Sequence, residues 1–133
     1  METERTPPTT PPSLGRTLRS FGFAGAGLAY LVRTQPNFRV HVAAAVSVVA
    51  TAIGVGATTV ELAVLFLAIG LVMVCEAFNT ALEAVVDLAS PTIHPLARIA
   101  KDVAAAGVLI AAIAAAGVGL VILGPRLVAL LRL

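Results

Sequence analysis

Residues 76–102 read EAFNTALEAVVDLASPTIHPLARIAKD, and this polar stretch decides the fold. It contains four of the seven acidic residues, the only lysine and one of the two histidines. Beyond Arg39, the sequence on either side of it is almost free of charge. Because ionisable groups are costly to place among apolar ones, such a cluster indicates either a functional site or a strongly paired network.

The composition is that of a membrane protein with room for one domain. Of the 133 residues, 59% are hydrophobic and only 12% are charged, whereas soluble domains carry about 25% charged residues. The net charge of +2 and the lack of interleaved basic and aromatic residues argue against nucleic-acid binding. Cys75 is the only cysteine, which excludes an intramolecular disulfide and favours a buried apolar role for this side chain.

The N-terminal region divides into a tail and a helix. Residues 1–12 carry four prolines and no apolar periodicity, which predicts a disordered tail. We expect no signal peptide, because the prolines stand where its basic and apolar regions would be. Over residues 13–34, with Ser13 as N-cap, apolar residues recur at steps of three and four. Arg16 and Arg19 lie off this apolar face, which is typical of an amphipathic helix on the membrane surface.

Three uncharged runs predict three membrane-spanning helices. The first and third runs, residues 42–60 and 103–125, have 19 and 23 residues, and a span needs about 20. The middle run has only 14, so its helix must continue through Glu76 to reach water. A break over residues 35–39 and turns near Thr58 and Ser90-Pro91 separate the helices. We therefore expect a single domain over residues 13–133, with spans over about residues 40–59, 61–89 and 95–124.

The basic residues predict the orientation of these helices. An odd number of spans places the two ends of the chain on opposite sides of the membrane. Seven of the nine basic residues precede the first span or fall between the second and third, and two follow the third. Because basic residues favour the cytoplasmic side, the N-terminus and residues 76–102 are expected at the cytoplasmic face of the membrane.

Two polar faces are expected to meet across the Ser90-Pro91 turn. Four polar residues, spaced by three, four and four, share one face of the second spanning helix: Glu76, Asn79, Glu83 and Asp87. After the turn, residues spaced by four and three form a basic face of the next helix, followed by an aspartate: His94, Arg98, Lys101 and Asp102. The acidic face cannot point at lipid, so it faces other helices or a wet cleft.

Carboxylates beside a lysine at a membrane edge suit phosphoryl transfer. Two carboxylates and an amide can hold Mg²⁺, which prefers hard oxygen ligands, and Mg²⁺ with a lysine can neutralise a nucleotide triphosphate. A deeper carboxylate can take the proton of an alcohol. Walker and protein-kinase motifs are absent from the sequence, so a nucleotide site would be of another kind.

Spacing alone leaves two other interpretations open. The charged residues can form only a paired polar network at a helix end, as charges near membrane boundaries often do. Intramembrane carboxylates also mark ion or proton paths. This last interpretation is weakened because the other two spans are expected to carry no ionisable residue that would continue such a path.

Two segments, EAFNTALEAVVD and SPTIHPLARIAKDVAAAGVLIAA, resemble the signature of the prokaryotic diacylglycerol kinase family. The resemblance covers about residues 16–112, and the core E-x-x-N-T-A-x-E-x-V-V-D with the later A-K-D is long and specific. The segments NFRVH and SPTIHPLARIAKDVAA look more like the undecaprenol kinase branch. The resemblance implies an all-α membrane protein with an N-terminal surface helix and three spans. It also implies MgATP as co-substrate and a homotrimer whose active sites are shared between subunits at the cytoplasmic interface.

The resemblance further implies roles for individual residues. Glu76 corresponds to the general base that deprotonates the lipid hydroxyl, and Asn79 belongs to the same polar site. Glu83 corresponds to a metal-binding glutamate, and Asp87 is a supporting polar residue. The positions that correspond to nucleotide contacts are Arg16, Glu83, His94, Lys101 and Asp102.

One position departs from the family's pattern. The family usually has a second metal-binding glutamate just before its Asn-Phe-Arg segment, where this chain has Gln35. A glutamine offers a carbonyl oxygen but no charge, so a lower metal affinity is expected. Three consequences are possible. Asp87 or bound water can replace the missing metal ligand, Glu83 and the ATP phosphates can be enough to hold the metal, or the enzyme is slow.

We therefore predict a membrane lipid kinase that transfers the γ-phosphate of ATP to a lipid alcohol, with undecaprenol as the preferred acceptor. One alternative is a diacylglycerol kinase that makes phosphatidic acid. A second is a non-catalytic membrane protein that responds to nucleotide or metal and has kept the fold. A third is a small carrier or proton path. The expected partners are membrane lipids and further copies of the chain, and not nucleic acid.

Overall fold

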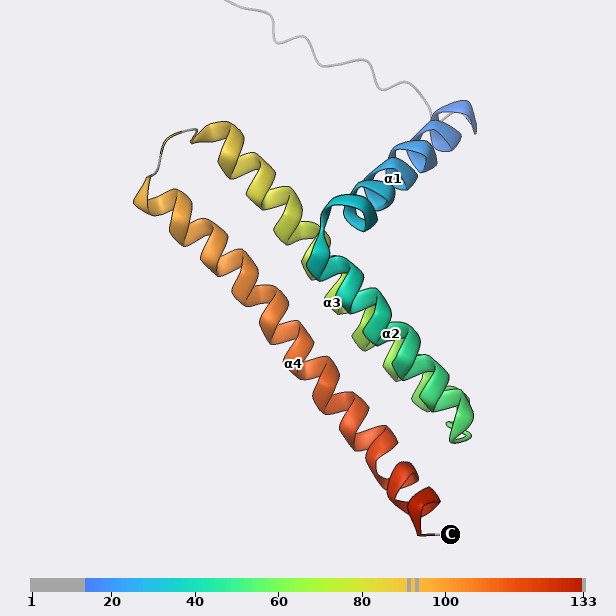
Figure 1. The fold of residues 1–133 in the computed structure, drawn as a ribbon. Coiled ribbons are helices and arrows are strands. Elements are labelled where there is room, and N and C mark those ends of the chain that lie inside the picture. The colour runs from blue at the N-terminus through green and yellow to red at the C-terminus, as the bar shows by residue number, and fades with distance from the viewer. Residues whose placement is uncertain (1–13, 91, 93, 133) are drawn as a thin grey trace, which may run out of the picture.

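The chain folds into four helices joined by short connections (Figure 1). The computed structural model describes residues 14–90, 92 and 94–132. The helices are α1 (Leu14–Thr34), α2 (Pro36–Gly54), α3 (Thr59–Ala89) and α4 (Pro95–Leu131). α4 packs mostly along α3, α2 also packs on α3, and α1 diverges from the start of α2. The predicted all-α class is confirmed for the described residues.

The two ends of the helical bundle differ in their connections. At one end, which we call the turn end, residues 90–94 join α3 to α4, and α1 lies toward the same end (Figure 1). At the other end, the loop end, residues 55–58 join α2 to α3, and α4 finishes at Leu131. The polar stretch that begins at Glu76 therefore belongs to the turn end.

Three of the helices are long and apolar enough to cross a membrane, as predicted. α2 has 19 residues, or about 28 Å, which matches a hydrocarbon core of about 30 Å. α3 has 31 residues and α4 has 37, which correspond to about 46 and 55 Å. α3 and α4 can therefore carry polar residues beyond the depth that α2 covers.

α2 begins at Pro36 rather than near residue 40, and it ends at Gly54 rather than near residue 59. The expected break after α1 is confined to Gln35, which has extended backbone angles (φ −102°, ψ 105°). A proline disfavours a helical conformation in the residue before it. It nevertheless suits the first position of a helix, where its missing N–H is not needed. Residues 37–39 are therefore helical and not part of the break.

The loop between α2 and α3 is closed by a glycine and a capping box. Gly56 has a φ of 68°, in the left-handed region that glycine adopts without strain. The Thr58 side chain accepts a hydrogen bond from the Glu61 backbone N–H, and the Glu61 carboxylate accepts one from the Thr58 backbone N–H. α3 consequently begins at Thr59, close to the expected residue 61, and it ends at Ala89 as expected.

α4 continues to Leu131, although the sequence predicted a span that ends near residue 124. Pro125 lies inside the helix, where it lacks an N–H and leaves the carbonyl four residues earlier without its usual donor. Near a membrane boundary, water or a neighbouring side chain can satisfy such a carbonyl. The predicted end at the proline is thus wrong by about two turns.

α1 is the helix expected over residues 13–34, and the structure describes it from Leu14. None of its residues is buried, and it packs mainly against α2. Ser13 and the tail at residues 1–12 lie outside the described residues. The location of α1 on the membrane surface and the division of the chain into a tail and one domain remain predictions.

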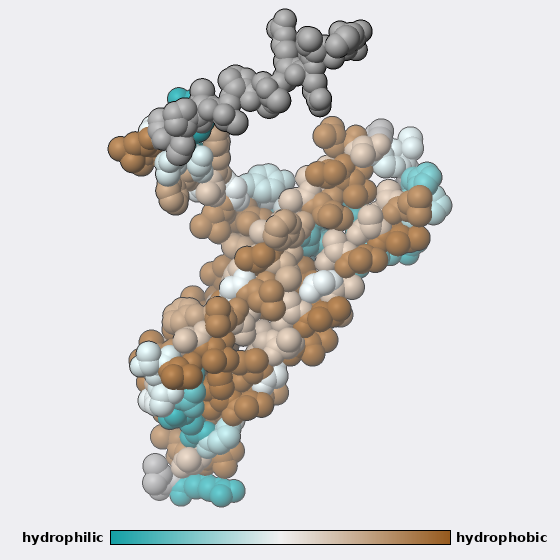
Figure 2. Space-filling model, turned by 180° about the vertical axis from the view of Figure 1, so that it is seen from behind, coloured by the Kyte–Doolittle hydropathy of each residue, from teal (hydrophilic) through white to brown (hydrophobic). Residues whose placement is uncertain are grey.

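The interior of a single chain is small, and a cluster of its buried apolar residues lies at the loop end. Ala52, Leu65 and Leu123, one from each spanning helix, are 0%, 2% and 7% exposed and form a hydrophobic core there. Most large apolar side chains face outward, and hydrophobic surface extends along the helices (Figure 2). A surface of this kind suits contact with lipid or neighbouring chains rather than water.

Candidate active site

The polar face of α3 begins with a buried carboxylate. Glu76 is 2% exposed, and Asn79 and Thr80 on the next turn are also buried. The Asn79 amide Nδ2 donates to Glu83 Oε1 at 3.1 Å. The Asn79 Oδ1 and Thr80 Oγ1 atoms are buried and have no hydrogen-bond partner among the described residues. Because buried polar atoms normally have partners, we expect a ligand, water or neighbouring chain to supply them.

A cavity of about 230 Å³ is lined by Glu76 and Asn79. α2 contributes Asn37 and His41 to its wall, and α4 contributes small and apolar side chains. Because Asn37 and His41 belong to the first turns of α2, Glu76 lies level with the start of that helix. This agrees with the depth expected from the short uncharged run that precedes Glu76.

The sequence did not identify Asn37 and His41 as site residues. They are four residues apart and therefore share a face once α2 begins at Pro36. The expected start near residue 40 left Asn37 in a break and concealed this pairing. His41 also corrects one step of the sequence argument, because α2 does carry ionisable residues in its first turns. The same is true of α4, which carries Arg126 in its last turns.

A longer apolar groove of about 550 Å³ runs between α2, α3 and α4. Its lining extends along α4 from Ala112 to Leu127, a distance of about 22 Å at the rise of a helix. His41 and Ala112 line both this groove and the Glu76 cavity. The groove therefore adjoins the buried carboxylate at one end and reaches the loop end at the other.

The turn end holds a third, more polar cavity of about 350 Å³. Its lining includes four of the predicted site residues: Asp87, His94, Lys101 and Asp102. Lys101 Nζ lies 2.5 Å from Asp87 Oδ1, and Arg98 Nε lies 3.7 Å from Asp102 Oδ2. The acidic face of α3 and the basic face of α4 thus meet across the turn, as their spacing predicted.

His94 also has a structural role that the spacing did not indicate. It is the N-cap of α4, and its Nδ1 accepts a hydrogen bond from the Leu96 backbone N–H at 3.2 Å. Pro95 occupies the first position of the helix, where its missing N–H is not needed. With Nδ1 engaged, Nε2 is the ring nitrogen that remains to contact a ligand in the cavity.

The predicted site residues on α3 form two groups along the helix. Glu76 and Asn79 line the deep cavity, and Asn79 donates a hydrogen bond to Glu83. Glu83 itself lines none of the three cavities. Lys101 pairs with Asp87 and not with Glu83. Glu83 lies about 10 Å from Glu76 along the helix, so it stands between the buried carboxylate and the polar cavity.

Arg16 and Gln35 line none of the three cavities described above. Gln35 Nε2 donates to Thr34 Oγ1 at 3.3 Å, at the junction of α1 and α2. Arg16 lies in the exposed helix α1. A single chain therefore does not bring either residue into the groups formed by α3 and α4.

The candidate metal ligands of the described residues do not gather into a cluster. Among the described residues, no group of three or more histidine, cysteine, aspartate or glutamate side chains gathers that could bind one. Mg²⁺ commonly binds through one or two carboxylates together with substrate phosphates and water. The donor set of Glu83 and the Asn79 amide group therefore fits an ion that arrives with a nucleotide.

Residues 22–123 match the sequence model of the family described as prokaryotic diacylglycerol kinase. This segment is well over half of the chain and includes every predicted site residue except Arg16. The chain belongs to the prokaryotic diacylglycerol kinase family. The family predicted from the motifs of residues 76–112 is thereby confirmed.

Individual members of the family show the same relationship. The chain is 48% identical over 115 residues to a diacylglycerol kinase of Synechocystis, covering 86% of this chain and 66% of that protein. It is 40% identical over 114 residues to an undecaprenol kinase of Bacillus subtilis, covering 86% of this chain and 93% of that protein. It is 33% identical over 100 residues to a diacylglycerol kinase of Escherichia coli, covering 75% of this chain and 82% of that protein. These relatives are all named as lipid kinases, in agreement with the predicted enzyme class.

Proposed function

We propose that this family member transfers the γ-phosphate of ATP to the hydroxyl of undecaprenol, with diacylglycerol as the alternative acceptor. The Bacillus subtilis relative supports the first acceptor and the Synechocystis relative supports the second. The groove that adjoins the Glu76 cavity is one continuous apolar groove, and this shape favours an alcohol with a single long chain.

The observation that carries the proposal is the junction between the apolar groove and the Glu76 cavity. His41 and Ala112 line both spaces. A lipid chain that occupies the groove would bring its terminal hydroxyl to the buried carboxylate. Helix packing gives no reason to bury a carboxylate at this position, because burial of a carboxylate costs free energy. An alcohol substrate gives such a reason, because its hydroxyl needs a proton acceptor.

In the proposed step, Glu76 accepts the proton of the lipid hydroxyl while the hydroxyl oxygen attacks the γ-phosphorus. The bond from the γ-phosphorus to the β–γ bridging oxygen breaks, and ADP leaves. Before this step, Asn79 Oδ1, which is buried without a partner among the described residues, can accept the hydrogen bond of the entering hydroxyl, whose proton then passes to Glu76. Asn79 Nδ2 meanwhile keeps Glu83 oriented.

The nucleotide is proposed to bind at the turn end. Lys101 and Arg98 supply positive charge in the polar cavity, and His94 Nε2 faces the same ligand. Asp87 holds Lys101 in place until the phosphates arrive. Glu83 would bind the Mg²⁺ that accompanies ATP and neutralises the charge that develops on the phosphates.

The turn end is proposed to face the cytoplasm. Most basic residues of the described chain lie in α1, at the start of α2 or beside the α3–α4 turn, and only Arg126 and Arg132 lie at the loop end. This asymmetry supports an orientation with the turn end inside and the loop end outside a bacterial plasma membrane. α1 would then lie along the inner surface of that membrane.

A homotrimer is proposed as the working assembly. Large apolar side chains are exposed along all three spanning helices, and the chain alone has little interior. Neighbouring copies can cover such surfaces. They can also bring Arg16 or Gln35 of one copy toward the site of another.

The function is tested with purified protein in detergent, radiolabelled ATP, and undecaprenol or diacylglycerol as the acceptor. We expect a labelled lipid phosphate from undecaprenol, with its identity established by mass spectrometry. If diacylglycerol is labelled more strongly than undecaprenol, diacylglycerol is the preferred acceptor and undecaprenol the alternative. If neither lipid is labelled while an active family member labels its substrate under the same conditions, the chain is not a kinase of either alcohol.

A further inference from the structure

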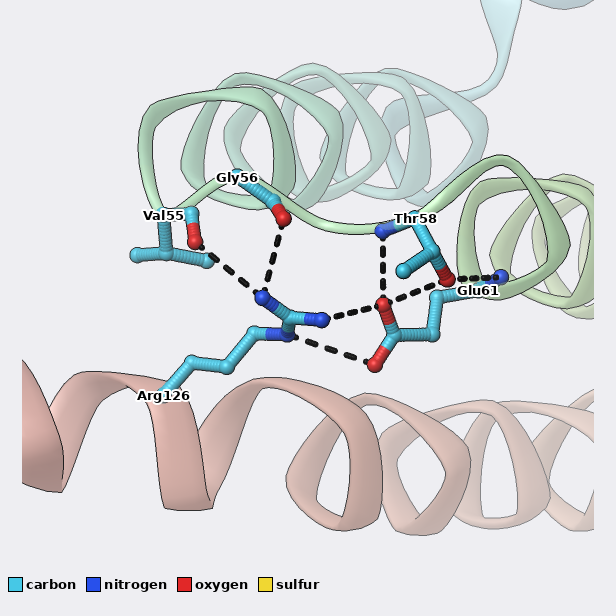
Figure 3. A network of polar contacts seen from close by, with 5 residues as sticks. All are labelled: Val55, Gly56, Thr58, Glu61 and Arg126. Atoms are coloured by element: carbon cyan, nitrogen blue, oxygen red, sulfur yellow. Dashed lines mark hydrogen bonds and ion pairs between the residues drawn. The ribbon is translucent and has the colours of Figure 1, made fainter.

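A network of polar contacts joins all three spanning helices at the loop end (Figure 3). The Arg126 guanidinium binds the Glu61 carboxylate in a fork, with Nη2–Oε2 at 2.6 Å and Nε–Oε1 at 3.2 Å. Its Nη1 donates to the Gly56 carbonyl at 2.9 Å and to the Val55 carbonyl at 3.4 Å. Arg126 thus connects α4 to the end of α2 and to the start of α3. We call these contacts the Arg126 clamp.

The same carboxylate also caps α3. Glu61 Oε2 accepts hydrogen bonds from the Thr58 backbone N–H at 2.6 Å and from the Thr58 hydroxyl at 2.7 Å. The carbonyls that Arg126 reaches belong to the loop just after α2, where backbone acceptors lack helical partners. The clamp therefore supplies hydrogen-bond donors to polar groups that would otherwise lack partners at the membrane boundary.

The clamp lies beside the loop-end part of the apolar groove. Leu123, Gly124 and Leu127, which flank Arg126 along α4, all line the groove. Leu123 also belongs to the hydrophobic core at the loop end. The groove thus runs from the Glu76 cavity to the turn of α4 that carries Arg126.

The clamp ties this turn of α4 to the end of α2, in addition to the small core that contains Ala52 and Leu123. α4 packs extensively on α3 but only lightly on α2. Pro125 removes a backbone hydrogen bond from α4 directly before Arg126, and prolines of this kind permit a helix to bend. Because α2 and α4 both form walls of the groove, a contact that ties them together fixes its shape at this end.

We infer that Arg126 and Glu61 are positioning residues for the far part of the lipid tail, and that they set the preference for long over short lipid alcohols. Neither residue can reach the reacting atoms, which lie at the other end of the groove. A short alcohol would occupy only the part of the groove next to Glu76. A long one would also pack against the walls that the clamp fixes. This inference rests on the proposed lipid kinase function.

The test compares undecaprenol with farnesol, a short alcohol of the same chemistry, in the full chain and in Arg126→Met. This variant keeps a flexible apolar stem and removes the fork. We expect the KM for undecaprenol to rise at least about fivefold, because contacts with the far part of the chain stabilise the bound substrate and the transition state equally, and their loss raises KM without changing kcat. The KM for farnesol and the kcat for both alcohols should stay unchanged. Arg132→Met, which removes the neighbouring loop-end arginine, is the matched control and should behave as the unaltered chain.

Glu61→Gln provides a second variant if Arg126→Met does not fold. A glutamine can still complete the capping box, but it weakens the fork. Glu61→Gln should also raise the KM for undecaprenol and not that for farnesol, by a smaller factor than Arg126→Met. Equal losses for both alcohols, or no loss for either, would overturn the inference and leave the clamp as part of the scaffold.

A binding measurement separates this inference from the proposed function. Each alcohol that binds the folded protein should raise its melting temperature in detergent, whether or not it is phosphorylated. We expect Arg126→Met to lose most of the shift caused by undecaprenol and to retain the shift caused by farnesol. If the unaltered chain shows the shifts but phosphorylates neither alcohol, the proposed function fails and the positioning role of Arg126 stands. If the undecaprenol shift survives in the variant, the positioning role fails.

Discussion

The loop end and the turn end of this molecule satisfy their polar groups in opposite ways. At the loop end, Glu61 and Arg126 bind each other and the surrounding backbone, above a core in which Ala52 and Leu65 are almost completely buried. At the turn end, Asn79 Oδ1 and Thr80 Oγ1 are buried without partners among the described residues. Buried polar atoms without partners cost free energy, so an end that carries them depends on stability supplied elsewhere.

This difference separates the residues that hold the helices from the residues proposed to act on the substrate. The capping box, the clamp and the small core fix α2, α3 and α4 at one end. The cavities that contain Glu76 and Lys101 lie at the other. Substitutions at the loop end should therefore change stability more than chemistry, and substitutions at the turn end should do the reverse.

The largest expected effect belongs to Glu76→Gln. Removal of a general base typically costs about 10²- to 10⁴-fold in rate, so we expect kcat to fall by about 10³-fold. Stability should hold or increase, because glutamine has nearly the same shape and buries no charge. Single-turnover kinetics and thermal unfolding in detergent measure the two quantities. If Glu76→Gln instead abolishes nucleotide binding, Glu76 is a nucleotide ligand and not the general base. The comparison variant is Glu83→Gln, which should raise the KM for MgATP.

Lys101→Met should weaken the nucleotide site without weakening the fold. A hydrogen bond to a charged phosphate contributes about 1.5–3 kcal/mol, so kcat/KM for ATP should fall by roughly 10- to 100-fold. The Lys101–Asp87 pair is partly exposed to solvent, and such pairs contribute at most about 1 kcal/mol to stability. Titration with ATP and denaturant unfolding separate the two effects. A large loss of stability with unchanged ATP affinity would make Lys101 a structural residue.

Gln35→Glu tests the position where the chain departs from its family's pattern. A carboxylate adds the charge that a glutamine lacks, so the Mg²⁺ concentration for half-maximal activity should fall by a few-fold, within about tenfold. The Gln35 side chain donates to the hydroxyl of its neighbour Thr34 in an exposed position, so the fold should tolerate the change. Thr34→Ser, which retains a hydroxyl beside it, is the control. Absence of activity in both the unaltered chain and the variant would favour the non-catalytic alternative.

Much of the fold could be predicted because it follows from local chemistry. Uncharged runs require spans, and the excess of charge in residues 76–102 requires an aqueous boundary. The pairing of the faces that contain Asp87 and Lys101 follows from residue spacing on two helices that share a short turn. These inferences depend on helical periodicity, which does not change when a helix starts a few residues early.

Features that depend on helix ends and long-range contacts were not predictable in the same way. The sequence predicts boundaries at Pro36 and Pro125, yet the first begins a helix and the second lies inside one. The first error concealed the Asn37–His41 face of the Glu76 cavity. The second concealed the Arg126 clamp, because Arg126 was expected outside the helix and Glu61 is 65 positions away in the sequence.

Thr58→Ala should affect the loop end alone. It removes the side-chain acceptor of the capping box, and loss of such a cap costs about 1 kcal/mol. We expect this loss in the free energy of unfolding, with kcat for a short lipid alcohol unchanged. Thr59→Ala, at an exposed neighbouring position, should be neutral. A fall in kcat as large as that of a turn-end substitution would contradict the separation of the two ends.

The smallest effect is expected for Thr80→Val, which removes a buried hydroxyl without a partner among the described residues. The hydroxyl loses its contacts with water on burial and gains nothing in return within one chain. We therefore expect the variant in detergent without lipid substrate to be as stable as the unaltered chain, or more stable by up to about 1 kcal/mol. Thr51→Val is the matched control, because the Thr51 hydroxyl donates to the Ser47 carbonyl at 2.8 Å and its loss brings no such gain. If Thr80→Val is instead destabilised, the hydroxyl has a partner in a neighbouring copy or in bound lipid, and the turn end is completed by assembly rather than left open for the substrate.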